Sequence, residues 1–492
     1  MYEHIDADDL ELEAQGYAPA MPRRFSLLSL FSLGFALTAT WNGFGSAIGT
    51  SLAESSSSGT IWTLVIAALM NLVVSLGMAE LVSAFPNSGA QYYWSFKVAS
   101  PEWAPFASYM SACISTCGWW LGLASVCNFV AATMLAILQI CVKEYTPSPL
   151  HQWFGYVAVL WLAVLLNIYA ARSLPALNQY LLYFSVSTLL VTILVILVCA
   201  APNYQSSVWV FTDTTNLNRS YDKSFLFVLC LLNNTYGFMG TDAGAHLAEE
   251  IPSPSINAPK VMIYPVIIGL VTAWPFAIAC MYVITDIERV VSPPSGIGLV
   301  EIYLQATGSD FATVLLLAAF AICLFGCAVA NITGSSRQIW AASRDNCYPL
   351  STWLAEIHPK HQMPMNAACL TAIFTTLYGV IFLRSTTAFA SMESLCGGDV
   401  LAFFPDDISI LEDGDPSSTS LAACGVVIFI TTAYMVLAWY LWQRHVFTGP
   451  RLGTQFIQKY RSQVAGLPHK YTSYSMVDQP SNEPIDKDGK VD

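Results

Sequence analysis

Apolar and polar positions follow one another along the chain in long blocks, and these blocks predict membrane-spanning helices. A bilayer core about 30 Å thick is crossed by about 20 apolar residues in an α-helix. The apolar runs are Leu27–Ile48, Ile61–Leu81, Phe106–Ile140, Phe154–Ala170, Tyr180–Ala200, Phe225–Ala248, Val261–Ile284, Phe311–Ile332, Met365–Leu383 and Leu421–Trp442. The third run is too long for one perpendicular helix and too short for two, so we interpret it as one long, tilted helix. The pattern predicts an all-α integral membrane protein with about ten spans.

Composition narrows the function classes. Of the 492 residues, 55% are hydrophobic and only 11% are charged, with a mean hydropathy of +0.53. Soluble proteins devote about a quarter of their residues to charged side chains, so a soluble enzyme is excluded. No basic run indicates nucleic-acid binding, and no Gly-rich loop followed by Lys indicates a primary pump. The 13 cysteines lie mostly inside apolar runs without metal-ligand spacing, so we expect neither a metal site nor a cofactor.

The distribution of basic residues predicts the orientation. Lys and Arg are retained on the cytoplasmic side of a membrane. With a cytoplasmic N-terminus, 15 of the 20 Lys and Arg residues face the cytoplasm. We therefore expect both termini inside and the glycosylation sequon at Asn218 outside. The plasma membrane is the expected location, with a vacuolar or other internal membrane as the alternative.

Two of the runs contain residues that interrupt a helix. The segment Thr40–Ser46 in run one holds two glycines and an asparagine, and Asn233–Asp242 in run six holds two of each. Non-helical backbone at membrane depth is tolerated only where it faces protein or a wet cavity. Interrupted helices at matching positions of two halves are typical of transporters with inverted repeats. The alternative is that the glycines only allow close helix packing.

These interruptions predict the substrate site, because an interrupted helix leaves backbone N–H and C=O groups unpaired. Carbonyls near the first interruption would hold an ammonium group, and free N–H groups near the second would attract a carboxylate. Aromatic rings beside the interruptions would face a bound cation. The alternative for each ring is that it only packs against neighbouring helices or lipid. The predicted substrate-binding residues are Thr40, Trp41, Asn42, Gly43, Tyr236, Gly237, Phe238 and Gly240.

Asp242 and His246 are the candidates for proton coupling. Their i, i+4 spacing places them on one helix face, and ionisable residues inside a membrane are functional candidates by default. Histidine titrates near neutral pH, which suits proton transfer. The alternatives are that Asp242 caps a half-helix and that His246 makes a structural hydrogen bond. Sodium is the alternative coupling ion, because Asn331 and Thr333 offer oxygen ligands, although no carboxylate cluster supports sodium binding.

Four segments in sequence order resemble one transporter family. They are Ala79–Trp94, Asp242–Pro252 with Asn257–Lys260, Ser335–Asp345, and Tyr440–Arg451. They are similar to motifs of the amino acid–polyamine–organocation superfamily, in particular its fungal choline/GABA/amino-acid permeases. The resemblance implies a fold of two inverted repeats of five helices, with helices one and six interrupted. It also implies an aromatic gate or substrate-stacking residue at Tyr236.

One stretch departs from that family, whose permeases have twelve helices. Residues Glu393–Ser420 contain seven acidic residues and no Lys or Arg, so they cannot span a membrane. Family helix ten and most of helix eleven are therefore missing from the predicted set. The predicted parts are an acidic cytoplasmic tail (1–25), a core of nine spans (26–384), an acidic external loop (385–420), a final span (421–443) and a cytoplasmic tail (444–492).

The sequence thus predicts a secondary transporter and not an enzyme. Its expected partners are a small amine or amino acid, protons and the lipid bilayer, and no nucleic acid. Because family helix ten helps to close the outer side of the pathway, the alternative is a permease-like protein that does not transport, or a substrate sensor. Neither the substrate nor the oligomeric state follows from the sequence.

Overall fold

The computed structural model describes residues 7–215, 222–383 and 432–450. All regular elements in these ranges are helical. The chain divides into two units. The first unit comprises residues 1–18 and 451–492. Its described part contains helix α1 (Ala7–Ala14). The second unit, residues 19–450, holds the remaining elements.

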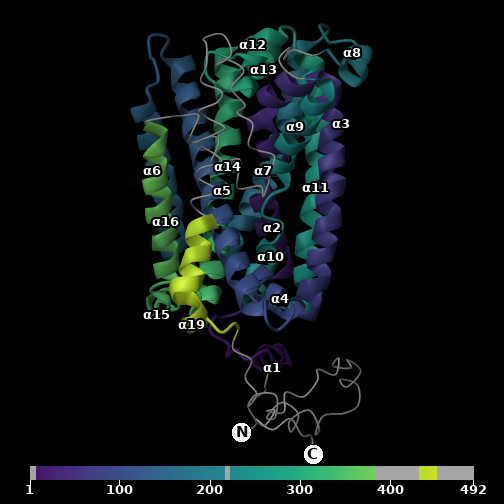
Figure 1. Ribbon diagram of the computed structural model, residues 1–492. Helices are drawn as coiled ribbons and strands as arrows, with labels where there is room; N and C mark the ends of the chain where they lie inside the picture. Colours follow the sequence, from purple (N-terminus) through teal and green to yellow (C-terminus); the bar gives the residue numbers. More distant parts are fainter. Residues whose placement is uncertain (1–6, 216–221, 384–431, 451–492) are drawn as a thin grey trace, which may run out of the picture. The chain divides into compact units, whose positions relative to one another are not determined.

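Long helices form the body of the second unit (Figure 1). They are α2 (Leu27–Thr38), α3 (Thr40–Ala84), α5 (Ala104–Cys141), α6 (Pro149–Tyr169), α7 (Leu174–Ala200), α11 (Pro254–Val283), α14 (Asp310–Arg344) and α16 (Met365–Gly379). Shorter elements are α4 (Gln91–Val98), α8 (Ser207–Thr212), α9 (Lys223–Thr235), η1 (Tyr236–Phe238), α10 (Ala243–His246), η2 (Ala248–Glu250), α12 (Ile287–Val291), α13 (Gly298–Thr307), α15 (Ser351–Leu354), η3 (Ile381–Leu383), η6 (Trp439–Gln443) and α19 (Arg444–Val446).

Seven stretches of the described residues are long and apolar enough to cross a membrane. One of them, Leu27–Ala84, contains the first two predicted runs, and the third run forms the single helix α5, as predicted. The sixth run is divided among α9, η1 and α10, none of which is long enough alone. Residues 432–442 of the last run are helical, and the helix continues to residue 446. The acidic segment 385–420, Asn218, residues 1–6 of the first predicted tail and residues 451–492 of the second lie outside the described residues. The missing helices and the inverted repeat therefore stay predictions.

The helix that follows the first interruption changes direction at Ser55 and Ser56. Ser56 has a φ of 52°, in the left-handed region that side chains rarely adopt. The Ser56 hydroxyl donates to the carboxylate of Asp213, and the Ser58 hydroxyl donates to the Asp213 carbonyl at 2.5 Å. These bonds to the segment after α8 hold the bend that separates the first two predicted spans.

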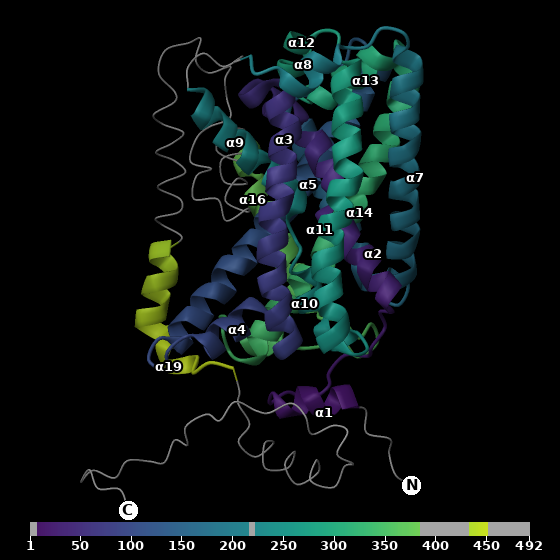
Figure 2. The ribbon, with the colours of Figure 1, turned by 90° about the vertical axis from the view of Figure 1, so that its right-hand side faces the viewer.

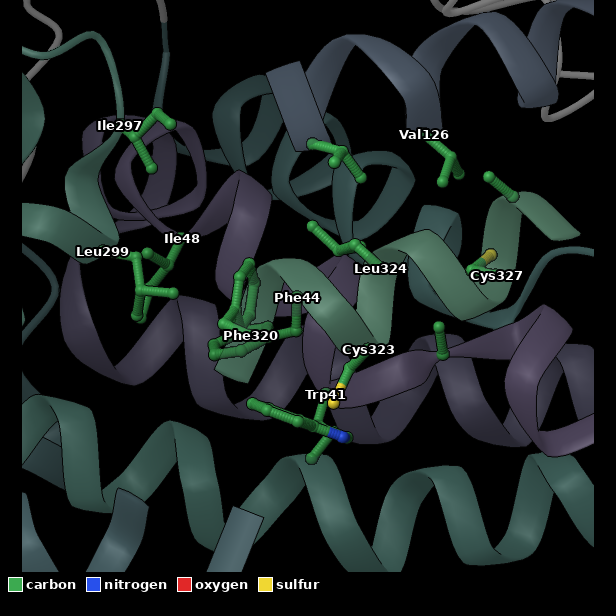
Figure 3. Packing of buried hydrophobic residues seen from close by; sticks show 14 of the residues in the cluster. Trp41, Phe44, Ile48, Val126, Ile297, Leu299, Phe320, Cys323, Leu324 and Cys327 are labelled. Carbon is green, nitrogen blue, oxygen red and sulfur yellow. The ribbon is translucent and has the colours of Figure 1, made fainter. Parts of the chain in front are cut away.

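The core lies where α3 packs along α11 and α14 crosses it (Figures 2 and 3). Trp41 meets the rings of Phe276 and Phe320 edge-on, with centroids 5.4 Å apart in both pairs. Figure 3 shows Phe44 and Phe320 gathered beside Trp41. Large apolar side chains such as Val73 on α3 are exposed, as expected for surfaces that face lipid. Packing of the buried rings fixes the helices that frame the site.

Candidate functional site

The first interruption lies between α2 and α3, at Ala39. This residue has φ 38° and ψ 40°, and a new helix begins at Thr40. The sequence placed the interruption at Thr40–Ser46, and that position is wrong by one helical turn, because Gly43 and Gly45 lie inside regular helix. A Cβ atom on Gly45 would lie 3.0 Å from the Phe320 ring. The glycines here serve close packing, the alternative reading of the pattern.

The second interruption is confirmed in run six. Helix α9 ends at Thr235, and after η1 the chain stays non-helical until α10, with Gly240 at φ +75°. Figure 2 shows α9 and α10 at clearly different levels of the bundle. Because α10 has only four residues, its dipole is small. The predicted attraction for a carboxylate therefore rests on free N–H groups rather than on helix length.

The two interrupted segments touch through glycines. A Cβ on Gly43 would lie 3.0 Å from Gly237 Cα, and a Cβ on Gly237 would lie 3.2 Å from the Thr40 carbonyl oxygen. Only residues without a side chain allow the backbones of α3 and η1 to approach this closely. The glycines thus bring the two interruptions side by side.

We predict that Gly43→Ala lowers stability by about 1–3 kcal/mol, because the added methyl group presses on backbone that cannot rotate away. Thermal melting in detergent measures the change. Gly77→Ala is the matched control on the same helix, since a Cβ there meets nothing within 4 Å. Equal melting temperatures for the two variants would contradict the close contact.

A cavity of about 640 Å³ lies next to the interruptions. Its walls come from the end of α2, the start of α3 and α4, the middle of α5, the segment around η1, and α14. The lining residues are Leu37, Thr38, Ala39, Gly43, Gln91, Ala107, Met110, Ser111, Ile114, Ser115, Gly118, Trp119, Gly122, Val126, Tyr236, Met239, Gly240, Asp242, Leu324, Cys327 and Asn331. A volume of this size accommodates a small organic molecule.

The structure divides the predicted site residues into two groups. Gly43, Tyr236, Gly240 and Asp242 line the cavity. The others are packed beside it: Thr40, Trp41, Asn42, Gly237, Phe238 and His246. These six residues do not line the cavity. A contact of the first five with substrate and a role of His246 in proton coupling stay predictions.

Two of the predicted aromatic residues illustrate the division. Trp41 is fully buried, and its Nε1 donates to Ser185 Oγ at 2.9 Å. Tyr236 instead presents its ring to the cavity, while its hydroxyl lies 2.9 Å from Ser125 Oγ. The hydrogen bond orients the Tyr236 ring, so this residue keeps the geometry expected of a substrate-stacking side chain.

Asp242 and His246 are in contact, as their i, i+4 spacing predicted. Asp242 Oδ2 lies 3.2 Å from His246 Nε2 and accepts a hydrogen bond from Gln91 Nε2 at 2.5 Å. His246 Nδ1 lies 3.1 Å from the carbonyl oxygen of Ser88, and Trp119 meets the buried imidazole edge-on at 5.7 Å. The imidazole is thus held on three sides, and Asp242 connects it to the cavity.

This geometry requires the pair to hold one proton beyond that on Nδ1. A carbonyl oxygen only accepts, so His246 Nδ1 must donate to Ser88. The contact between Nε2 and Asp242 Oδ2 then needs a proton on one of the two atoms, giving either an imidazolium with a carboxylate or two neutral groups. In both cases the net charge of the pair is zero. Losing the shared proton leaves the pair with a charge of −1 and breaks the contact.

Two buried ion pairs lie just after the C-terminal end of run six. Glu250 contacts Arg337 at 2.7 Å, with both side chains almost fully buried. Glu249 accepts two hydrogen bonds from Arg344, at 2.7 and 2.9 Å. The two pairs join the segment after run six to α14.

Ser88 connects these ion pairs to the aspartate–histidine pair. Its carbonyl oxygen accepts from His246, and its N–H donates to Glu249 Oε1 at 3.3 Å. One residue of the loop before α4 thus joins the two buried charged clusters.

Sequence reasoning missed the contribution of α5 and α4 to the cavity. Ala107, Ser111, Ser115, Gly118 and Gly122 follow one another at spacings of three or four, so they form one small-residue face of α5. That periodicity is visible in the third apolar run and was the available signal. Gln91 had no such local signal, whereas Asn331 was already a candidate oxygen for sodium.

Comparison with known proteins agrees with the geometry. The amino acid permease family matches this chain over residues 25–467. The chain belongs to the amino acid permease family. Membership confirms the superfamily inferred from the four motifs, and with the seven apolar stretches it makes this permease a multi-pass membrane protein.

Individual relatives are distant. The permease is 28% identical over 374 residues to a choline transporter of Saccharomyces cerevisiae, and the match covers 76% of this chain and 66% of that protein. It is 27% identical over 404 residues to the amino-acid permease BAT1 homolog of Oryza sativa subsp. japonica, covering 79% and 77% of the two chains. The amino-acid permease BAT1 of Arabidopsis thaliana is also 27% identical, with coverages of 80% and 78%. The permease thus spans about two thirds of the length of the first relative.

Proposed function

We propose that this permease is a secondary transporter that moves a small amine or amino acid across a membrane. The observation that carries the proposal is the cavity at the meeting point of the two interrupted helices. There, Gly43, Tyr236, Gly240 and Asp242 line a space that fits a small molecule. The printed functions of the relatives, choline and amino-acid transport, agree with this substrate class.

Proton coupling is part of the proposal and rests on Asp242 and His246. A buried pair that holds one removable proton, and whose acid lines the substrate cavity, is suited to exchanging that proton during transport. The charged or titratable groups joined to it are Glu249, through Ser88, and then Arg344. We propose that loss of the proton loosens this connection and so favours opening at the cytoplasmic end. We also propose that both termini lie in the cytoplasm, that Asn218 lies outside, and that the protein resides in the plasma membrane.

Uptake into liposomes that contain the purified permease tests the proposed function. We expect a labelled amine or amino acid to accumulate when the outside is more acidic than the lumen. Ser115→Trp, which fills the cavity, should reduce uptake at least 10-fold, because the indole occupies the substrate volume. The matched control is Met134→Trp, at an exposed position of the same helix.

Three outcomes separate the alternatives. Uptake by the parent and by Met134→Trp, but not by Ser115→Trp, supports transport through this cavity. Equal uptake by all three proteins contradicts the site. Saturable binding without any uptake would identify a substrate sensor that does not transport.

A further inference from the structure

Three segments bring basic side chains together at the end of the bundle where α4 and α15 lie (Figure 1). They are the segment before α2, the turn between α6 and α7, and the loop between α15 and α16. Arg24 of the first segment donates from Nη1 to the carbonyl oxygen of His361 at 3.4 Å, and from Nη2 to Gln362 Oε1 at 2.5 Å. The charge of Arg172, in the second segment, acts on both Arg24 and His361. Segments far apart in the chain thus form one basic cluster, which consists of Arg24, Arg172, Lys360 and His361.

The loop between α15 and α16 is held in shape by its own hydrogen bonds. His358 Nδ1 accepts from the backbone N–H groups of Lys360 and His361, at 3.3 Å in both cases. The N–H of Gln362 donates to the His358 carbonyl oxygen at 2.7 Å, and the His361 ring meets Tyr169 of α6 edge-on at 5.8 Å. These contacts fix the turn that carries Lys360 and His361.

The acidic side chains around Arg24 do not balance the positive charge of the cluster. Burial lowers the pKa of Arg24, and repulsion from Arg337 and Arg172 adds to this effect, against the attraction of Glu250. Glu250 itself contacts Arg337 at 2.7 Å, so its charge is already shared. The side chains of Arg172 and Lys360 are exposed and make no hydrogen bond or ion pair with another residue that the structure describes. The cluster therefore keeps an excess of positive charge.

The imidazole of His361 is subject to the same excess. Burial lowers the pKa of His361, and repulsion from His358, Lys360 and Arg172 lowers it further. Glu356, which precedes these residues in the loop, accepts a hydrogen bond from an amide group of α16 at 3.3 Å. An anion placed between the three segments would be attracted by several cations at once.

The cluster lies where the lipid-facing surface of the bundle begins. Leu27 and Leu28, the first residues of α2, follow Arg24 closely and are 42% and 45% exposed. Tyr169, the last residue of α6, is 74% exposed. In the proposed orientation this end of the bundle faces the cytoplasm, and the cytoplasmic leaflet carries anionic lipids. A headgroup at the cluster would leave its acyl chains beside these exposed apolar side chains.

We infer that this cluster binds the headgroup of an anionic phospholipid, with Arg24, Arg172 and Lys360 contacting the phosphate oxygens. The inference goes beyond the transport function, and of the proposals above it uses only the orientation. The two hydrogen bonds of Arg24 to the loop use two of the five guanidinium N–H groups, which leaves three for the phosphate. Guanidinium groups are suited to this role because they bind phosphate through two parallel hydrogen bonds. The lipid thereby links the segment before α2 to the loop between α15 and α16.

Titration of the purified permease in detergent with short-chain phospholipids tests this inference. The anionic ligands are the dioctanoyl forms of phosphatidylserine, phosphatidic acid and phosphatidylinositol phosphate. Dioctanoyl phosphatidylcholine is the lipid without net charge, and inorganic phosphate is the free anion. The shift in melting temperature gives each affinity. We expect the anionic lipids to bind at least 10-fold more tightly than phosphatidylcholine, and their affinity to fall as the salt concentration rises.

Variants assign the binding to the cluster. Arg172→Gln combined with Lys360→Gln should weaken the binding of the anionic lipids at least 10-fold, because each basic residue near a headgroup adds to the attraction. The melting temperature without lipid should stay at the parental value, since both side chains are exposed. The matched control is Lys143→Gln combined with Lys223→Gln, which removes the same charge from exposed positions after α5 and at the start of α9.

Several outcomes would overturn the inference. They are a failure of the anionic lipids to bind, an unchanged affinity in the Arg172→Gln and Lys360→Gln variant, and an equal loss in the control variant. Displacement of the lipid by an equal concentration of inorganic phosphate would show that the cluster takes a free anion instead.

The acidic N-terminal segment of the chain is the other candidate occupant. If lipid binds only after Asp8, Asp9, Glu11 and Glu13 are replaced by their amides in the full chain, this segment covers the cluster and the inference is wrong. Equal lipid affinity with and without these four replacements supports it. Because every readout is lipid binding, each of these outcomes leaves the proposed transport function untouched.

Discussion

Arg337→Met is expected to lower the free energy of unfolding by about 3–5 kcal/mol, the range for removing one partner of a buried ion pair. Arg337 contacts Glu250 at 2.7 Å, and both side chains are about 98% buried or more. The substitution leaves the Glu250 carboxylate buried without its cation, and desolvation of that charge is not offset. Thermal melting and the yield of monodisperse protein in detergent measure the loss.

The double variant Glu250→Leu with Arg337→Met separates this cause from simple loss of packing. Replacing both charges by apolar side chains leaves no uncompensated ion, so it should recover most of the lost stability. Arg289→Met is the matched control, because Arg289 is 63% exposed and its contact with Glu301 is longer, at 3.6 Å; its expected cost is about 0–1 kcal/mol. A double variant less stable than either single variant would contradict this account.

Asp242→Asn is expected to abolish proton-driven accumulation while preserving substrate exchange. The asparagine amide still donates to neutral His246 Nε2 and so imitates the protonated pair, but it cannot release a proton. Net uptake driven by a proton gradient should fall at least 10-fold, whereas exchange of internal for external substrate should continue. Both quantities are measured in liposomes with equal amounts of protein.

Gln91→Leu provides the comparison, because Gln91 binds the same Asp242 oxygen without titrating. The substitution removes one hydrogen bond, which contributes about 0.5–1.5 kcal/mol. Uptake should therefore fall only slightly, and its dependence on the proton gradient should remain. Proton-driven accumulation by Asp242→Asn at the parental rate would show that the pair is structural. In that case the coupling group lies elsewhere.

In the proposed mechanism, Ser88 connects the proton-binding pair Asp242–His246 to the ion pairs that follow run six. Substrate and proton act on the cavity, whereas the ion pairs of Glu249 and Glu250 tie run six to α14. Because Ser88 binds both His246 and Glu249, a shift of the imidazole alters the orientation of a carboxylate in the other cluster. The two charged clusters thus form one hydrogen-bonded unit rather than two independent sites.

The sequence by itself determined the class of the protein, because membrane insertion depends on local properties. The length and the hydropathy of a run can be read from about 20 consecutive residues. Local reading of this kind was enough to predict α5 as a single helix and to predict the interruption of run six. The contact between Asp242 and His246 also followed from the sequence, since residues four apart lie on one helix face.

Only the tertiary structure decided which residues line the site, because lining depends on contacts between segments far apart in the chain. Trp41 and Tyr236 were both candidates for substrate binding in the sequence, yet Trp41 fills the core against Phe276 and Tyr236 lines the cavity. The first interruption falls at Ala39 rather than at the glycines, which allow close packing instead, Gly43 against η1 and Gly45 against Phe320. Asn331 was visible in the sequence only as a candidate oxygen in helix eight, and the packing of α14 placed it in the cavity wall.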